Sequence, residues 1–576
     1  MTETKYEFGL DIPELEKRTS KEYINTKVFL KPDSPEYTSL AEGDKEALKY
    51  LVKAGAILED IHLQIDDHHN LPFKKFLESE VKKGNRQAEL TKILFDAQKG
   101  INALDRLSNK IHLAKGITNQ PGIGVYPEDL KKEEFHAILI KMLKEKKIEE
   151  VKNILNQRSI VVRDGEYLKS IDYVDYFKED FAKMADLFEK ASKVSTNADF
   201  NEYLILQAKA LRKADPMLDA EADKKWATLQ DTPLELTLTR ENYEDSITNS
   251  YAKNEELVRL LNERNITPVS KDCLGFRVGI VNKEGTDFIL RIKEFLPDLA
   301  DHMPYKEEYD QDIKNGSIKQ TMVDADLVIL AGDVGAYRAG ITLAENLPNG
   351  DKPSLKKGGG RRNVYHRQIR FTNMTEVKEK LNAILDPKQH EYYDPEADHW
   401  FTIGHENCHT LGPRKEKSQL GEYRSIIEEN KADMCGIAFV DLLTNLSYYN
   451  ETQRKKIIVT AVTDLFLKAK PDMSQAHRVR TVMQNYYLHQ KDAYFINENN
   501  LIHVNIDKVA DGAYEMLKEI IRVQLDDNFN KGKEYIDKYF KWTREMDIIG
   551  EQLKKLSSTL NCRVENELAD KILSEN

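Results

Sequence analysis

The chain has 576 residues, of which 40% are apolar and 32% are charged, and its net charge is −12. This composition is typical of a soluble globular protein, and about 150 residues per domain would give about four domains. Basic residues are mixed with acidic ones, so the coherent basic face of a nucleic-acid-binding protein is excluded. No apolar run approaches the ~20 residues of a membrane helix.

The N-terminal segment and the cysteines indicate the compartment. "MTETKYEFGLDIPELEKR" has no apolar core and no small-residue cleavage site, so it is not a secretory signal. The four cysteines are widely spaced and form no CxxC pair, which argues against a disulfide framework. We expect a cytoplasmic protein, a monomer or homodimer, with no nucleic-acid or membrane partner.

The pattern is helical from about residue 40 to residue 225. "DKEALKYLVKAGAILEDIHLQI" and "SIDYVDYFKEDFAKMADLFEKAS" place apolar residues three and four positions apart, with charged residues between them. Residues 1–228 therefore predict a helical N-terminal region.

Short apolar runs replace this pattern in residues 229–375. Leu234–Thr239 alternates, Leu274–Val281 and Ala325–Gly332 are short and apolar, and Gln368–Phe371 follows a glycine-rich stretch. Such runs, bounded by turn residues, predict strands. We expect a β-rich middle region.

The glycine-rich stretch itself, "KKGGGRRNVYHR" from Lys356 to Arg367, is the most basic local segment. An anion-binding loop is one interpretation, but the segment lacks the GK[ST] ending of a phosphate loop. We favour a mobile surface loop.

Residues 376–576 are again helical and contain "HWFTIGHENCHTLGP". In a helix, positions i and i+4 share a face, so His405 and His409 can bind one metal ion from a single turn. Zinc accepts nitrogen and oxygen ligands, and a catalytic site keeps one position open for water. Glu406, beside the ligand face, can take the proton of that water and deliver it to a leaving amine.

The next predicted helix, "YRSIIEENKADMCGIAFVDLL", contains an acidic pair at i and i+4. Glu429 can supply a third ligand, and Asp433 can accept a hydrogen bond from the far ring nitrogen of a ligand histidine. A solvated helix face is the alternative for the acidic residues taken alone. Beside the histidines at this spacing, we favour a site for one Zn²⁺ per chain.

These two segments resemble the dipeptidyl peptidase III family of zinc exopeptidases. The likeness is closest to the shorter relatives, including the peptidase-like half of some plant Nudix proteins, which carry a five-residue HExxH followed by Gly-Pro. No Nudix box is present. The resemblance implies that His405, His409 and Glu429 bind zinc and that Glu406 is the general base. Glu428 and Asp433 then support the ligand histidines.

Three weaker matches extend the resemblance over about the C-terminal 350 residues. They are "ENLPNG", "SQAHR" and "ENYEDS", and for each an ordinary turn or helix start is the alternative interpretation. By this resemblance, Asn346 and Asn349 bind the N-terminal end of the substrate, and His477 stabilises the transition state. Tyr243 and Glu244 then lie near the cleft.

The sequence departs from the family pattern at two places. The family strand before the last of these segments offers a tyrosine to the reaction centre and a glutamate to the substrate ammonium, whereas "LELTLT" has no tyrosine and only Glu235 could serve. The family's basic residue one turn after the histidine is displaced, since Arg480 lies three residues after His477.

We therefore expect a predominantly helical α+β fold with two lobes and a cleft, with zinc on a helical lobe and a small barrel-like β-rich part in the other. The expected activity is zinc-dependent hydrolysis of short peptides, with release of N-terminal dipeptides. Three alternatives stay open. One is an endopeptidase or a hydrolase of non-peptide bonds, one is a peptide-binding protein without catalysis, and one is an unrelated fold with the same ligand order.

Overall fold

The computed structural model describes residues 6–20, 24–104, 110–117, 122–242, 245–311, 320–332, 344–347, 361–366, 374–413, 418–468, 476–556 and 560–575. The chain forms two compact units. The first comprises Met1–Val281, Asp326–Thr342 and Ser558–Asn576, and the second comprises Asn282–Ala325 and Leu343–Ser557. Among the described residues, no helix is long and apolar enough to cross a membrane.

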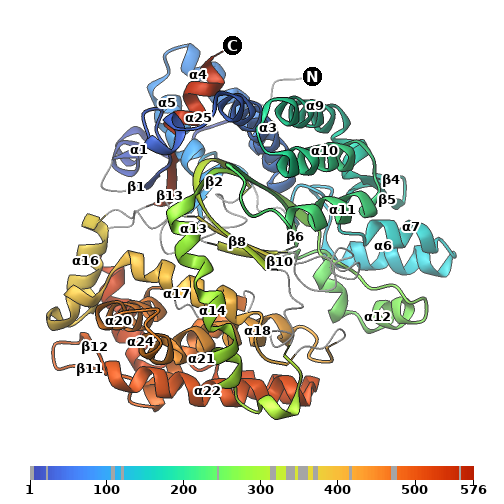
Figure 1. The fold of residues 1–576 in the computed structure, drawn as a ribbon. Coiled ribbons are helices and arrows are strands. Elements are labelled where there is room, and N and C mark those ends of the chain that lie inside the picture. The colour runs from blue at the N-terminus through green and yellow to red at the C-terminus, as the bar shows by residue number, and fades with distance from the viewer. Residues whose placement is uncertain are drawn as a thin grey trace. The chain divides into compact units, whose positions relative to one another are not determined.

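The first unit is built mainly of helices (Figure 1). Its helices are α1 Ile12–Thr19, α2 Pro35–Thr38, α3 Glu42–Asp66, α4 Asn70–Lys82, α5 Arg86–Gln98, α6 Lys132–Lys144, α7 Ile148–Ile154, α8 Tyr173–Tyr176, α9 Lys178–Val194, α10 Ala198–Arg212, α11 Pro216–Trp226, η1 Thr248–Lys253, α12 Glu255–Asn262 and α25 Glu567–Ser574. Its strands are β1 Ile24–Val28, β2 Asn102–Leu104, β3 Lys110–His112, β4 Ser159–Asp164, β5 Tyr167–Asp172, β6 Leu234–Asn242, β7 Asp272–Asn282 and β13 Leu560–Glu565.

Helix α3 packs against the strands of the first unit because a glycine faces them. A Cβ atom on Gly55 would lie 2.9 Å from the Phe276 ring of β7 and 3.3 Å from Ile329 of β8. Phe276 also stacks on Phe188 of α9, with 6.3 Å between ring centroids. The apolar spacing that predicted these helices thus corresponds to the face that each one buries.

One part of the helical prediction is wrong. Residues 159–172 form the antiparallel hairpin of β4 and β5, in which Asp164 pairs with Tyr167. Gly165 in the turn has a φ of +60°, a conformation that costs glycine little. Gly165 and Glu166 form the two-residue loop, and a glycine at its first position after the β-branched run Ile160–Val162 is the hairpin signal that the helical interpretation overlooked.

The largest sheet has the strand order β6-β7-β8-β10-β9. Strands β6 and β7 pair antiparallel in the first unit, with Leu234 opposite Ile280. Strand β8, Gln320–Ala331, runs from the second unit into the first. Its first half pairs in parallel with β10, Arg361–His366, which in turn pairs antiparallel with β9, Ala344–Leu347.

The predicted strands at Leu234–Thr239, Leu274–Val281 and Ala325–Gly332 are confirmed, although β6 continues to Asn242 and β8 begins earlier, at Gln320. The predicted surface loop is wrong for Arg361–His366, which is strand β10. Val364 and Tyr365 are fully buried there, so burial in the sheet outweighs the local glycine-rich composition. The segment Gln368–Phe371 lies outside the described residues.

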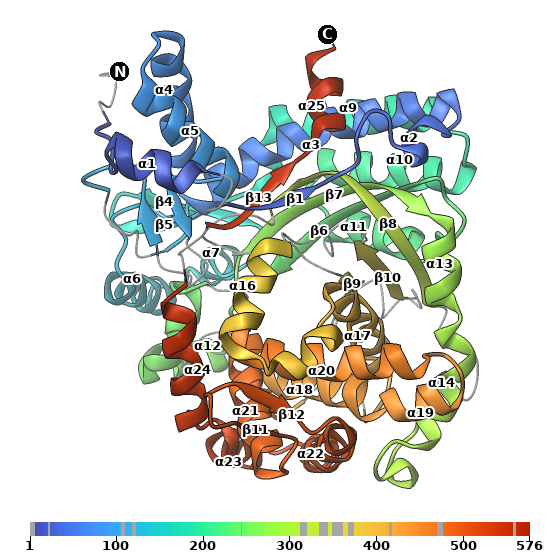
Figure 2. The same ribbon diagram turned by 90° about the vertical axis from the view of Figure 1, so that its left-hand side faces the viewer.

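The second unit is helical around strands β9, β10 and one short hairpin (Figure 2). Its remaining elements are α13 Lys283–Leu290, α14 Ile292–Asp301, η2 Lys306–Glu308, α16 Met374–Ile384, η5 Pro387–Tyr392, α17 Pro395–Cys408, α18 Tyr423–Ala438, α19 Val440–Asn445, α20 Glu451–Lys468, α21 Ala476–Gln490, β11 Tyr494–Ile496, β12 Ile502–Val504, α22 Ile506–Asp526, α23 Phe529–Tyr539 and α24 Arg544–Lys554. The predicted predominantly helical α+β class with two lobes is confirmed.

A single apolar core holds the second unit together. Helices α17, α18, α20 and α22 each contribute fully buried side chains to it, such as Ile403, Ile427, Val459 and Ile520. Helix α18 packs against both α17 and α22. The predicted domain ranges 1–228, 229–375 and 376–576 stay a prediction; the strands of the middle range are shared between the two units.

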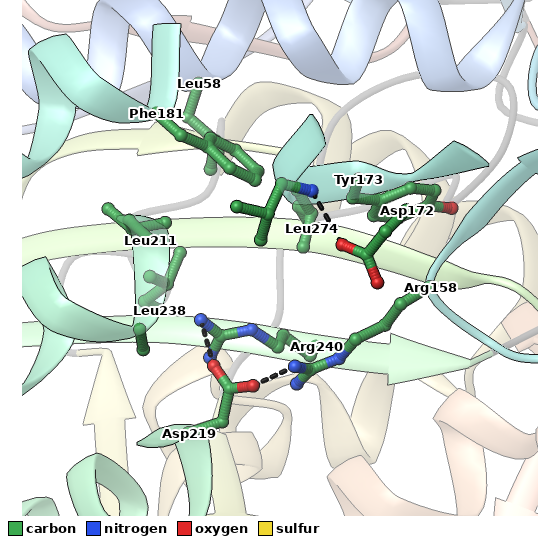
Figure 3. A pocket seen from close by; sticks show the side chains of 12 residues that line it. Leu58, Arg158, Asp172, Tyr173, Phe181, Leu211, Asp219, Leu238, Arg240 and Leu274 are labelled. Carbon is green, nitrogen blue, oxygen red and sulfur yellow. Dashed lines mark hydrogen bonds and ion pairs between the residues drawn. The ribbon is translucent and has the colours of Figure 1, made fainter. Parts of the chain in front are cut away.

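A buried ionic cluster ties several elements of the first unit together (Figure 3). Asp219 on α11 pairs with Arg240 of β6 at 2.6 Å and, through its other oxygen, with Arg158 just before β4. Burial, followed by the charge of Arg240, lowers the pKa of Arg158 to about 10. The Asp219 carboxylate thus lies between two guanidinium groups that repel each other, and Asp272 lies 3.5 Å from Nε of Arg158.

Replacing Asp219 by asparagine is expected to lower the free energy of unfolding of the first unit by about 3–5 kcal/mol, because it leaves two buried cations without their shared anion. Urea unfolding measures the loss. Asp199→Asn is the matched control, since Asp199 pairs with Lys225 at a position where its own side chain is 73% exposed, and such pairs contribute about 0–1 kcal/mol. A loss below about 1 kcal/mol for Asp219→Asn would contradict the assigned role.

Candidate metal centre

Helix α17 presents the HExxH segment at its C-terminal end. The helix begins after Asp394, whose side chain accepts a hydrogen bond from the N–H of Glu396 at 2.9 Å. It ends at Cys408, and His409 is its C-cap with φ −60° and ψ −23°. His405 and His409 therefore lie in the last turn, where the negative end of the helix dipole favours a cation.

Helix α18 brings a carboxylate to these two rings. The Nε2 atoms of His405 and His409 lie 3.1 Å apart. Glu429 places its carboxylate oxygens 3.5 Å from the first Nε2 atom and 4.0 Å from the second. Within the part of the chain that the structure describes, these three residues are the one group of histidine, cysteine and acidic side chains whose ligand atoms converge, all within 4.8 Å.

The two helices approach closely because both have a glycine at the contact. A Cβ atom on Gly404 of α17 would lie 3.5 Å from the Cα atom of Gly436 on α18. A Cβ atom on Gly436 would lie only 3.2 Å from the backbone nitrogen of His405. Small residues at this contact allow Glu429 to reach the histidines from a separate helix.

The hydrogen bonds of the rings fix which nitrogen atoms can bind a metal. Nδ1 of His405 lies 2.7 Å from Asp433, and Nδ1 of His409 lies 3.0 Å from Glu428. An ionised carboxylate only accepts, so each Nδ1 donates and each Nε2 carries its lone pair. Two lone pairs and the Glu429 carboxylate can then converge on one point. The donor set and its geometry fit a divalent metal ion such as Zn²⁺.

The charges around His409 favour an ionised Glu428. Burial raises the pKa of Glu428, but the neighbouring Lys431 and the His409 ring outweigh it and hold the pKa below its ordinary value. Burial likewise acts to lower the pKa of His409, but the hydrogen bond to Glu428 and the charge of Glu429 raise it overall. Glu428 is therefore ionised and accepts from the ring.

Glu406 follows the first ligand histidine and is 8% exposed. Burial raises its pKa to about 7, with the charge of His409 opposing the shift and that of Glu429 adding to it. A carboxylate with such a pKa exchanges a proton readily at neutral pH, which is what a general base needs. A bound divalent cation would favour the ionised form further.

Sequence reasoning missed a tyrosine behind Glu406. Tyr365 of β10 is fully buried, and its hydroxyl accepts hydrogen bonds from the side-chain amides of Asn407 at 3.2 Å and Asn363 at 3.3 Å. Burial and, to a smaller extent, the charge of Glu406 raise the pKa of this hydroxyl. Nothing in the sequence signalled the contact, because the segment carrying Tyr365 was interpreted as a loop.

The other predicted site residues are placed as follows. Glu235, in the first unit, is 2% exposed and accepts a hydrogen bond from Nε1 of Trp226 at 2.7 Å. Asn346 is on β9, opposite Asn363 of β10 in the strand register. His477 is the second residue of α21. Asn349, Tyr243 and Glu244 lie outside the described residues.

The fold is that of dipeptidyl peptidase III, which confirms the predicted resemblance at the level of structure. The solved structure of dipeptidyl peptidase III from Caldithrix abyssi is similar with a TM-score of 0.76 and 21% identity, covering 97% of this chain and 100% of that one. The enzyme from Corallococcus sp. strain EGB gives a TM-score of 0.73 and 16% identity, covering 99% of both chains.

A protein of known sequence is similar over nearly the whole chain. Nudix hydrolase 3 of Arabidopsis thaliana is 23% identical over 93% of this chain and 72% of its own length. No family model matches the sequence. The likeness to a plant Nudix protein agrees with the group of relatives that the HExxH segment suggested.

Proposed function

We propose that the protein is a zinc-dependent metallopeptidase that hydrolyses short peptides and releases dipeptides from their N-termini. The observation that carries the proposal is the convergence of the His405 and His409 lone pairs on the Glu429 carboxylate, with Glu406 beside them. The likeness in fold to two dipeptidyl peptidases III supports a peptide as the substrate.

The residues of this chain then divide the work of hydrolysis. His405, His409 and Glu429 would hold the Zn²⁺ ion, which when bound polarises a carbonyl and lowers the pKa of water. Glu406 accepts a proton as water attacks the peptide carbon, and donates it to the nitrogen as the C–N bond breaks. Burial raises the pKa of Glu406 above its ordinary value, which helps the carboxyl group to hold the proton between the two steps.

Five further residues are assigned to the substrate by the resemblance alone. Asn346, Asn349 and Glu235 would bind the N-terminal end of the peptide. Tyr243 would lie near the substrate, and His477 would stabilise the transition state. These five roles, like the release of dipeptides, are part of the proposal.

A second candidate function keeps the metal and changes the specificity. The carboxylate of Glu235 accepts from the Trp226 indole and from the Thr237 hydroxyl, at 2.7 Å and 3.4 Å, in a buried position. A carboxylate engaged in this way is a poor anchor for a substrate ammonium group. This contact favours an endopeptidase, or a hydrolase that does not require a free N-terminus.

A pool of short peptides with free or acetylated N-termini distinguishes the two. We expect the Zn²⁺-loaded protein to shorten only the free peptides, in two-residue steps that mass spectrometry detects. Equal cleavage of acetylated peptides, at internal bonds, would favour the second candidate. No cleavage by protein that holds stoichiometric zinc would overturn the peptidase proposal.

A further inference from the structure

Behind each ligand histidine lies a second set of contacts, and the two sets have the same composition. The set behind His405 begins at Asp433, which also pairs with the guanidinium of Arg480 on α21. The side-chain nitrogen of Gln484, one turn further along α21, lies 3.0 Å from the Asp433 oxygen that Arg480 contacts. It also lies 2.9 Å from the side-chain oxygen of Asn430. Gln484 is 1% exposed.

The set behind His409 begins at Glu428, which like Asp433 lies on α18. Lys431 pairs with Glu428 at 2.8 Å and donates to the backbone carbonyl of Leu411 at 2.6 Å, just after α17. The side-chain nitrogen of Gln524 on α22 donates to the other Glu428 oxygen at 2.9 Å. Each histidine is thus supported by a carboxylate, a cation and a glutamine.

The orientation of both glutamine amides follows from their partners. A carboxylate oxygen cannot donate, so the atom facing it must be the amide nitrogen in both cases. The same nitrogen of Gln484 also lies 2.9 Å from the side-chain oxygen of Asn430, whose Nδ2 atom lies 3.2 Å from the Tyr535 hydroxyl.

We propose that Gln484 and Gln524 are positioning residues of the metal centre, which orient the carboxylates that hold His405 and His409. The proposal deepens the proposed function and rests on it. The cations balance the charge of Asp433 and Glu428, and each glutamine adds a neutral donor to the same carboxylate. Each carboxylate is then held by two donors, so the imidazole that it contacts is oriented before a metal ion arrives.

The expected loss of zinc affinity depends on how far each glutamine lies from the metal ligands. Loss of the group that holds a metal-binding histidine typically lowers metal affinity about 10–100-fold. Each glutamine acts through such a group, so its loss should lower the zinc affinity by about tenfold, the lower end of this range. Because Gln484 and Gln524 lie on different helices and contact different carboxylates, the two losses should multiply in the double variant.

The test measures zinc affinity by competition with a chelating dye, with no substrate present. We expect Gln484→Met and Gln524→Met each to bind Zn²⁺ about tenfold more weakly than the wild type, and the double variant about 100-fold more weakly. The visible spectrum of the Co²⁺-loaded protein should shift in each, because it reports the orientation of the ligands. Gln524→Lys, which restores a donor, should return close to wild-type affinity.

Gln389→Met is the matched control. Gln389 is a buried glutamine of the same unit, and both ends of its amide bond to the backbone of Val504 at 2.8 Å. Its loss should lower stability without changing zinc affinity or the Co²⁺ spectrum. Gln524 is only half-buried, so its variant tests the proposal even where Gln484→Met fails to fold.

Two results overturn the proposal in distinguishable ways. Absence of zinc binding by the wild type would remove the metal centre itself, and the proposed function with it. Tight zinc binding by the wild type, with affinities and Co²⁺ spectra unchanged in both methionine variants, would remove only the positioning role.

Discussion

Replacing Glu406 by glutamine is expected to lower kcat for peptide hydrolysis by about 10²–10⁴-fold, the usual contribution of a general base. The amide has nearly the same shape as the carboxyl group but cannot accept a proton at neutral pH. Glu406 is not among the three converging ligands, so the zinc content of the variant should equal that of the wild type. Steady-state kinetics on a peptide that the wild type cleaves, with metal analysis of the same sample, measures both.

Glu396→Gln is the control for this variant. Glu396 is an exposed residue in the first turn of α17, so the substitution is chemically identical and lies on the same helix. Its kcat should remain within about twofold of the wild type, as for a surface substitution. A Glu406→Gln variant with wild-type kcat and full zinc content would show that another group moves the proton, or that the centre is not catalytic.

Replacing Glu429 by alanine is expected to weaken zinc binding by more than about 100-fold, beyond the range for groups that only support a ligand. The substitution removes the one anionic donor of the set and leaves two neutral imidazoles on α17. The remaining histidines keep their carboxylate partners, so the loss would come from the missing ligand and not from disordered rings. Dye competition at fixed pH measures the affinity.

Glu422→Ala supplies the comparison on the same helix. Glu422 precedes α18, is exposed and makes no capping hydrogen bond with its side chain. Its zinc affinity should equal that of the wild type. If Glu429→Ala also binds zinc normally, the third ligand must be another group, and the convergence at α18 would have no role in metal binding.

The proposed metal ligands could be singled out from the sequence because their spacing is local. Residues four apart on a helix share a face whatever the rest of the fold does, so His405 and His409 could be paired from the sequence alone. The same rule paired Glu429 with Asp433 on the next helix. The structure brings both pairs together, and His405 Nδ1 lies 2.7 Å from Asp433 as the spacing suggested.

The two glutamines that contact Asp433 and Glu428 could not be predicted, because these contacts join distant parts of the chain. Gln484 lies 51 residues from Asp433, and Gln524 lies 96 residues from Glu428. A single glutamine on an amphipathic helix gives no sign of its partner. Strand β10 was missed for a related reason, since neighbouring strands and not its own sequence decide that Val364 and Tyr365 are buried.

The glycine contact between α17 and α18 has a consequence for which substitutions the chain can tolerate. Gly436 is not among the three converging residues, yet any side chain there would push against the backbone of His405. The distance between the histidine nitrogens on α17 and the Glu429 oxygens on α18 therefore depends on the absence of a side chain at this position. Metal-site geometry is sensitive to shifts of about half an ångström, so in the proposed centre the preference for one ion over another would depend on this glycine.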